Sequence, residues 1–139
     1  MIWYDLEIKV LDNTIDNIYK NEYDRSDKNA EYDLYGIKNV KIDKNGFIPF
    51  GIIARLFKVV QDSSNEYVKT DSHFWLAPHL SIYSSGLFRG NTCTINKNSN
   101  QELKAPVYTF GYPVTIKKEE SRFQIVAPDL GWIRNVNIV

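Results

Sequence analysis

Three side chains could supply nucleophilic or metal chemistry: Cys93, His73 and His79. A cysteine with a histidine base forms a nucleophile for hydrolysis, and two histidines near Asp71 could begin a zinc site. Neither pattern is complete. Cys93 comes after both histidines in the sequence and lies in the strand-like segment NTCTI. The Asp-x-His spacing of Asp71 and His73 matches no common set of metal ligands. The sequence therefore predicts no metal, no cofactor and no catalytic residue. A small hydrolase built on Cys93 and His79 stays as an alternative.

Aromatic side chains form the second candidate set. Tyr108, Phe110 and Tyr112 alternate along one expected strand and its turn, which places them on one face. Trp75 and Trp132 stand at expected hairpin positions. Exposed rings give a large contact area for a partner, whereas buried rings belong to the core. We predict these five residues as the binding residues and keep the core interpretation open.

Composition limits the classes of protein. A chain of 139 residues forms one domain or two very small ones. Its hydrophobic fraction of 43% and charged fraction of 24% are typical of a folded protein. The 17 basic and 17 acidic residues leave no basic excess, so no nucleic-acid partner is predicted. One cysteine allows neither an intrachain disulfide nor a cysteine metal cluster.

The first ten residues, MIWYDLEIKV, bear on localisation. They are charged by residue 5 and lack a basic segment followed by a long apolar one, so no signal peptide is predicted. The longest apolar runs are much shorter than a membrane span. We expect a protein that is cytoplasmic or virion-associated and has no membrane partner.

Short alternating segments separated by turns dominate the chain. Residues 2–10 alternate as a half-buried strand, residues 14–23 favour a short helix, and residues 52–60 favour a strand. The Asn45-Gly46 pair predicts a hairpin turn, and Pro49 predicts an edge or bulged strand. A second hairpin is expected across Asp71-Ser72, and later strands at 87–88, 92–95, 107–110, 114–116, 123–126 and 132–139. This pattern predicts a mostly β protein with at most one or two short helices.

The last 35 residues resemble a bacterial SH3-like (SH3b) domain. The resemblance rests on an aromatic strand at Val107-Tyr108, a charged turn at 117–120, an apolar strand with Phe123 and Ile125, and a terminal Gly131-Trp132-Ile133. A weaker second copy falls at 57–83 and implies a closing strand at 80–82. The resemblance implies small SH3-like β-barrels, with an N-terminal strand and short helix at 1–45, a first unit at 46–95 and a C-terminal unit at 102–139. It also implies that Trp132 packs on the strand of Phe123 and Ile125.

SH3b domains are binding modules, so this resemblance implies no enzyme. We predict a non-enzymatic binding or assembly module, such as a structural component of a phage or similar particle, whose partner is a protein, a peptide or other subunits of the assembly. The alternative is a cell-wall or peptide-binding SH3b module that acts beside a separate peptidoglycan hydrolase.

Overall fold

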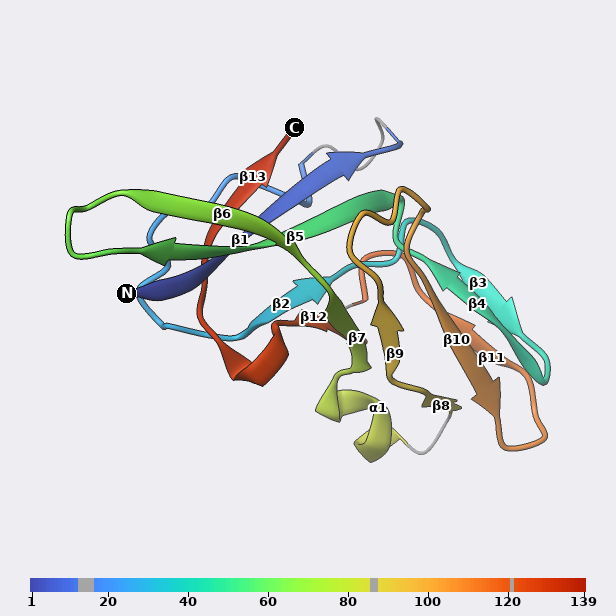
Figure 1. Cartoon of the computed structure of the whole chain (residues 1–139). Coiled ribbons are helices and arrows are strands. Elements are labelled where there is room, and N and C mark those ends of the chain that lie inside the picture. The colour runs from blue at the N-terminus through green and yellow to red at the C-terminus, as the bar shows by residue number, and fades with distance from the viewer. Residues whose placement is uncertain (13–16, 86–87, 121) are drawn as a thin grey trace.

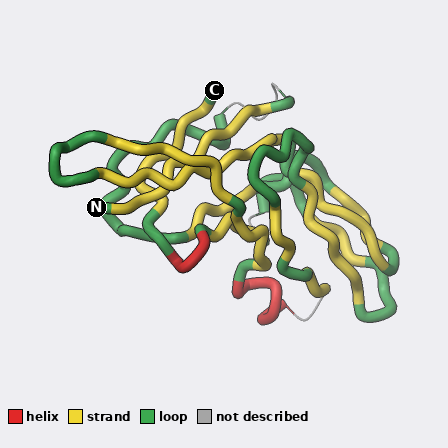
Figure 2. The backbone as a smooth tube through the Cα atoms, viewed as in Figure 1, coloured by secondary structure: helices red, strands yellow, loops and turns green. Residues whose placement is uncertain are grey.

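The computed structural model describes residues 1–12, 17–85, 88–120 and 122–139, and this part of the chain is mostly β. The described residues form thirteen strands, one α-helix (α1, Leu80–Ser85) and one 3-10 helix (Pro128–Leu130) (Figures 1 and 2). The prediction of a mostly β fold with few short helices is confirmed. None of these helices is long and apolar enough to cross a membrane.

Two helix positions differ from expectation. Of the helix expected at 14–23, residues 14–16 lie outside the described residues, and residues 17–23 form turns and one isolated bridge. Conversely, α1 occupies Leu80–Ser85, where a closing strand at 80–82 was expected. Ile82 is buried in the core, and its amide N–H donates to the carbonyl oxygen of His79 at 3.0 Å, so a helical turn forms where the resemblance implied a strand.

The largest twisted layer contains both ends of the chain. Its strand order is β13-β1-β5-β6, and β13 runs parallel to β1 whereas β5 runs antiparallel to it. Figure 1 shows the β5–β6 hairpin projecting beyond the rest of this sheet. The bounds are β1 Ile2–Val10, β5 Ile52–Gln61, β6 Tyr67–Ser72 and β13 Ile133–Ile138. The strands predicted at 2–10 and 52–60 are therefore confirmed.

Three further sheets complete the fold. Their orders are β2-β12-β7-β9, β4-β10-β8 and β11-β3. The last two sheets form the arm on the right of Figure 1. The bounds are β2 Glu31–Leu34, β3 Val40–Ile42, β4 Asn45–Pro49, β7 Phe74–Pro78, β8 Phe88–Gly90, β9 Cys93–Ile95, β10 Lys104–Thr109, β11 Val114–Ile116 and β12 Phe123–Val126. Since β4 pairs only with β10, the strand that contains Pro49 is an edge, as expected.

One hydrophobic core lies between these sheets. Leu6 and Ile8 of β1 reach it because alternate residues of a strand face one side. The rings of Phe50 and Phe123 lie 6.0 Å apart within it. Each of the segments 1–45, 46–95 and 102–139 contributes buried side chains to this single cluster. The division of the chain into those three segments stays a prediction.

The expected local hairpins are wrong at two places. β6 pairs with β5, whereas β7 pairs with β12 and β9, so no hairpin forms across Asp71-Ser72. Likewise β4 pairs with β10 and β3 pairs with β11, so Asn45-Gly46 does not join two paired strands. Asp71 and Ser72 belong to β6, and Asn45 and Gly46 belong to β4, so neither pair forms the expected turn. Burial of the flanking apolar side chains favours partners distant in sequence.

The C-terminal segment also pairs differently from an SH3-like unit. β10 pairs with β4 and β8, β12 with β2 and β7, and β13 with β1. The strands of residues 102–139 are thus distributed over four sheets and do not pair with one another. Trp132 consequently precedes a strand of the first sheet and not one beside β12.

Gly90 offers a direct test of this packing. A Cβ at Gly90 would overlap the ring of Phe123, which is fully buried, whereas a Cβ at Gly36 would meet its nearest atom at 3.7 Å. We expect Gly90→Ala to destabilise the fold by about 1–3 kcal/mol through overpacking, a fall in melting temperature of roughly 3–12 °C. Gly36→Ala is the control and should shift the melt by less than about 2 °C. Equal melts for the two variants would contradict this packing.

Candidate functional site

The structure does not bring Cys93 and His79 together as a nucleophile and its base. The Sγ atom of Cys93 faces the carbonyl oxygen of Asn91 at 3.9 Å, while Nδ1 of His79 is hydrogen-bonded to the hydroxyl of Ser81 at 3.0 Å. His73 is exposed. Among the described residues, no three His, Cys, Asp or Glu side chains form a group that could hold a metal ion.

The aromatic set lies on the surface of the arm. Tyr108, Phe110 and Tyr112 are 41%, 47% and 44% exposed, and the rings of Tyr108 and Phe110 meet edge to face at 6.4 Å. These three rings are therefore not core residues, so the core interpretation of them is wrong. Their role in binding stays a prediction.

The two tryptophans have different surroundings. Trp75 lies on β7 and is 37% exposed. Trp132 is half-buried, donates its indole N–H to the carbonyl oxygen of Arg25 at 2.8 Å, and stacks under the guanidinium of Arg134 at 5.3 Å. Trp132 thus joins the loop before β2 to the start of β13, which is a structural contact. The expectation that it packs on Phe123 and Ile125 is wrong.

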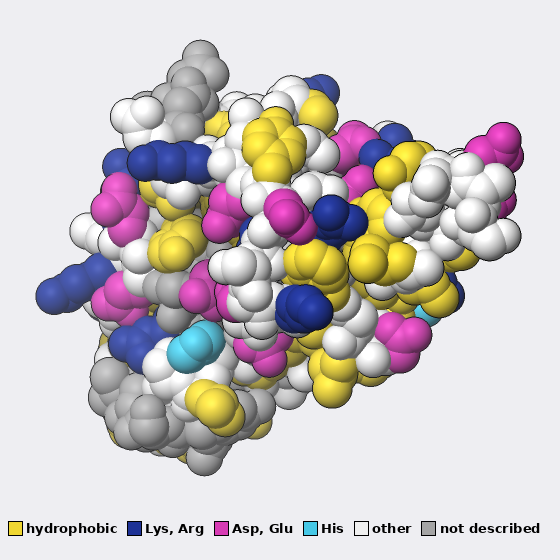
Figure 3. Space-filling model, turned by 90° about the vertical axis from the view of Figure 1, so that its left-hand side faces the viewer, with side chains coloured by type: hydrophobic (Ala, Val, Ile, Leu, Met, Phe, Trp, Pro, Cys, Tyr) yellow, Lys and Arg dark blue, Asp and Glu magenta, His cyan; other side chains and the backbone are white. Residues whose placement is uncertain are grey.

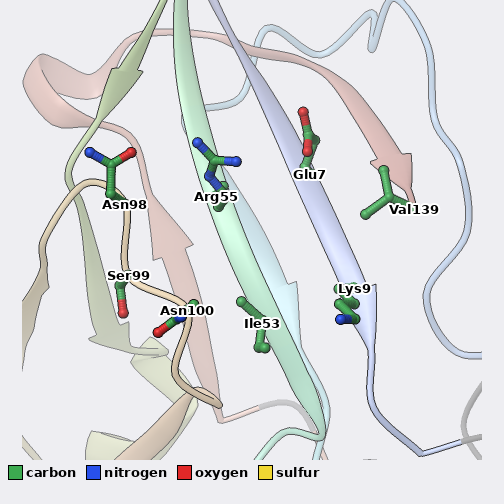
Figure 4. Close-up of a pocket in the computed structure, with 8 residues that line it drawn as sticks. All are labelled: Glu7, Lys9, Ile53, Arg55, Asn98, Ser99, Asn100 and Val139. Atoms are coloured by element: carbon green, nitrogen blue, oxygen red, sulfur yellow. The ribbon is translucent and has the colours of Figure 1, made fainter.

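A hollow that sequence analysis did not identify lies on the outer face of the first sheet. We call it the sheet hollow. It has a volume of about 450 Å³, which is in the range of small-molecule sites. Figure 4 shows side chains from β1, β5 and the loop at 98–100 around it. It is lined by Glu7, Lys9, Ile53, Arg55, Asn98, Ser99, Asn100 and Val139.

Strand geometry explains how these side chains meet. Glu7 lies directly opposite Arg55 across the β1–β5 ladder, and Lys9 lies opposite Ile53. All four face outward because Leu6 and Ile8, the alternate residues of β1, are buried. The pairing of β6 with β5 ends at Ser72, opposite Leu56, so the loop after β9 lies beside Ile53 and Arg55.

Ion pairs and a cation–π contact fix the positions of Arg55 and Glu7 in the sheet hollow. The Arg55 guanidinium donates to a carboxylate oxygen of Asp71 at 2.7 Å and stacks on the ring of Phe57 at 4.9 Å. The ammonium of Lys69 lies 4.0 Å from Glu7. Glu7 is the single carboxylate among the described lining residues, beside two cations. Lys and Arg bind phosphate or carboxylate oxygens, and the amides of Asn98 and Asn100 both donate and accept.

A second hollow, near Tyr32, is less suited to a ligand. It has about 410 Å³ and is lined in part by Arg25 and Glu22. The Arg25 guanidinium already donates to the carbonyl oxygens of Ile133 and Glu31, each at 3.1 Å. Burial raises the pKa of the Tyr32 phenol well above its usual range, so this side chain stays neutral. These contacts stabilise the fold and leave the Arg25 guanidinium less available to a ligand.

Charge on the surface is mixed. Figure 3 shows acidic and basic side chains interspersed with hydrophobic ones on the face toward which the β5–β6 hairpin projects. This mixture agrees with the formal net charge of zero. Binding of an anion therefore depends on local groups and not on a large field of one sign.

Comparisons with known proteins define the fold. No protein-family model and no curated protein sequence matches the chain. A mutant dUTPase of Staphylococcus bacteriophage 80alpha with dUpNHpp superposes with a TM-score of 0.57 and 14% identity, over 92% of this chain and 87% of that one. A mutant dUTPase from phage phi11 of S. aureus gives a TM-score of 0.58 and 12% identity, over 92% and 95%. The chain thus has the fold of these phage dUTPases.

These matches correct two predictions. The SH3b resemblance is wrong, because the dUTPase fold accounts for 92% of the chain. The interpretation as a non-enzymatic binding or assembly module, whether a structural part of a particle or a cell-wall module, is overturned as well, since the proteins that share the fold are enzymes.

The phi11 structure is described as showing a structural Mg(II) ion. That ion belongs to the phi11 protein, and the described residues of this chain contain no converging group of three His, Cys, Asp or Glu side chains.

The sheet hollow carries little signal in the sequence. Its residues come from four separate parts of the chain, at 7–9, 53–55, 98–100 and 139, and the 96–101 stretch resembles a linker because it is rich in asparagine. The one available clue is β1, where charged Glu7 and Lys9 alternate with apolar residues and must share an outer face. That clue gives no indication of Arg55 as their neighbour.

The contact of Trp132 gives the second testable prediction. Trp132→Phe keeps an aromatic ring but removes the N–H that binds the Arg25 carbonyl oxygen. We expect a loss of about 1–2 kcal/mol and a melting temperature lower by roughly 3–8 °C. Trp75→Phe is the matched control, because Trp75 is more exposed and its indole has no hydrogen bond among the described residues. A Trp132→Phe melt equal to that of Trp75→Phe would show that the indole bond is not stabilising.

Proposed function

We propose that this chain binds a nucleoside triphosphate at the sheet hollow and hydrolyses its phosphate chain. The observation that carries the proposal is the convergence of Lys9, Arg55 and Glu7 in one hollow of about 450 Å³. The fold supports it, because proteins with this fold are named dUTPases and one was solved with dUpNHpp. We take dUTP as the first substrate to test.

Arg55 and Lys9 are the phosphate-binding residues of this proposal. One N–H of Arg55 is used by Asp71 at 2.7 Å, and the planar guanidinium offers four more. Stacking on Phe57 at 4.9 Å limits the orientations of that plane. A guanidinium that is held in place before the ligand arrives loses less entropy when it binds a phosphate.

Glu7 is the general base of this proposal. Its carboxylate takes a proton from a water molecule as the water oxygen forms a bond to the first phosphorus of the nucleotide. The bond from that phosphorus to the bridging oxygen breaks, and pyrophosphate leaves with the bonding electron pair. Arg55, directly opposite Glu7 across the β1–β5 ladder, stabilises the charge on the phosphoryl oxygens.

The loop at 98–100 is the base-binding element of this proposal. Asn98 adopts a left-handed conformation with φ of 63°, which turns the chain sharply over the hollow. Asn98 and Asn100 present amide donors and acceptors, and Ser99 presents a hydroxyl. Base edges carry the complementary donors and acceptors, so these side chains suit recognition of a base.

Two substitutions test the assignment of roles. Glu7→Gln should lower kcat for dUTP about 10²–10⁴-fold with little change in affinity for dUpNHpp, because only proton transfer is lost. Arg55→Ala should weaken dUpNHpp binding about tenfold or more, since a charged hydrogen-bond donor is lost. Pyrophosphate release gives the rate and calorimetry gives the affinity.

Glu66→Gln is the matched control, because Glu66 is exposed in the β5–β6 turn. It should keep the wild-type rate. The proposal is wrong if the wild-type chain neither binds nor hydrolyses dUTP or the four common deoxynucleoside triphosphates. Full activity in Glu7→Gln would remove Glu7 from the mechanism.

A further inference from the structure

The strand β6 is an exposed edge of the first sheet. It pairs with β5 on one side, and no other described strand pairs with it. Residues 67–70 of β6 are exposed, and Figure 1 shows the β5–β6 hairpin projecting beyond the rest of the sheet. An edge strand presents unpaired backbone N–H and C=O groups, to which another strand can bind.

The hairpin turn fixes which backbone groups of β6 point outward. The N–H of Asp62 donates to the carbonyl oxygen of Glu66 at 3.0 Å. Hydrogen-bonded and non-hydrogen-bonded pairs alternate along an antiparallel ladder, so the even-numbered residues of β6 bond to β5. The N–H and C=O groups of Tyr67, Lys69 and Asp71 therefore point away from β5, toward the open edge.

The opposite edge of the same sheet, along β13, is covered by the chain itself. The N–H of Val136 donates to the carbonyl oxygen of Glu22 at 2.7 Å, and the N–H of Glu22 donates back at 2.9 Å. The N–H of Arg25 donates to the carbonyl oxygen of Arg134 at 2.9 Å. The sheet thus has one edge that its own residues cover and one edge, β6, that is open to another strand.

The charges on β6 are self-complementary in one register. If two copies of β6 pair antiparallel about a two-fold axis at Thr70, Lys69 of each copy lies directly opposite Asp71 of the other. The outward backbone groups of these two residues then face each other, as a hydrogen-bonded pair requires. An axis at Lys69 or at Asp71 places like charges opposite each other, which destabilises strand pairing. An axis at Val68 brings no opposite charges together.

The contacts within one chain extend this charge pattern. Asp71 accepts from Arg55 at 2.7 Å, and the ammonium of Lys69 lies 4.0 Å from Glu7. Across two joined sheets, the outer face would present Arg55 and Asp71 of one copy, followed by Lys69 and Glu7 of the other. Positive and negative charges alternate along this row. Exposed ion pairs add little affinity, so they act mainly by selecting the register.

Apolar side chains beside the open edge would also be covered. Tyr67 and Val68 are 63% and 59% exposed. A strand added to the edge lies about 4.8 Å from β6, so it shields both side chains from water. Backbone hydrogen bonds and this apolar contact would supply the affinity, as in other complexes formed by strand addition.

We infer that the β6 edge docks a second copy of this chain through its own β6, which gives a two-fold symmetric dimer with one continuous sheet. Both open edges are used in this pairing, and the β13 edges are covered, so the assembly closes at two copies. The inference rests on strand pairing and does not depend on the proposed function.

Charge reversal on β6 tests this dimer and its register. Sedimentation velocity of the wild-type chain over a concentration series should show a monomer–dimer equilibrium. Lys69→Glu places a carboxylate opposite Asp71, and Asp71→Lys places an ammonium opposite Lys69, so each variant alone should dimerise about tenfold more weakly or worse. An equimolar mixture of the two variants restores opposite charges at every pair. It should dimerise within about threefold of the wild-type affinity.

A second comparison tests the backbone bonds. Lys69→Pro removes the outward N–H, whereas Lys69→Gln removes the same charge but keeps that N–H and is the matched control. Proline is tolerated in an edge strand where its N–H would face solvent. Lys69→Pro should therefore weaken dimerisation more than Lys69→Gln. Lys44→Glu, a reversal of an exposed lysine between β3 and β4, should leave dimerisation unchanged.

Three results would overturn the inference. One is a wild-type chain that stays monomeric at concentrations up to about 1 mM; a strand of a different protein would then be the remaining partner for this edge. Another is a dimer of equal affinity in all the β6 variants, which places the interface elsewhere. The third is a mixture of the two folded charge variants that dimerises no better than either alone. Thermal melts establish folding, and if Asp71→Lys does not fold, the comparison of Lys69→Pro with Lys69→Gln decides.

Discussion

The parallel pairing of the first and last strands is the constraint on which the rest of the fold depends. β13 lies beside β1, with Leu6 opposite Val136, so the sheet is complete only when both ends of the chain meet. Arg25 secures this junction through its two bonds to the carbonyl oxygens of Ile133 and Glu31. The indole of Trp132 returns a bond to the Arg25 carbonyl. β1 thereby becomes an inner strand with a fixed outer face.

The candidate site follows from that fixed strand. Because β1 has neighbours on both sides, its outward residues Glu7 and Lys9 are held at defined places above the sheet. β5 has β6 as a partner only as far as Leu56, which leaves room for the 96–100 loop beside Arg55. The hollow is thus a product of strand pairing that ends early, and it requires no special backbone in β1 or β5.

Local patterns predicted individual strands well and their partners poorly. The alternation in residues 2–10 and the apolar run at 52–60 identify β1 and β5, because burial of one face fixes the period of the side chains. The Asn45-Gly46 pair matches a hairpin turn locally, yet both residues belong to β4. The Gly131-Trp132-Ile133 ending resembled an SH3-like unit, yet β13 pairs with a strand more than 120 positions away. No local pattern contains that information, and Arg55 and the 96–100 loop were missed for the same reason.

Charge balance at the sheet hollow bears on which anions the proposed site would select. Arg55 is matched by Asp71 at 2.7 Å, and Glu7 has Lys69 at 4.0 Å. A single phosphate that approached Arg55 would therefore meet Asp71 as a competitor and as a repelling charge. Under the proposed function, a phosphate chain that reaches Lys9 as well as Arg55 meets a second positive charge in the same hollow, which offsets that repulsion. The proposed site thus favours an anion long enough to contact both Arg55 and Lys9 over one that contacts Arg55 alone.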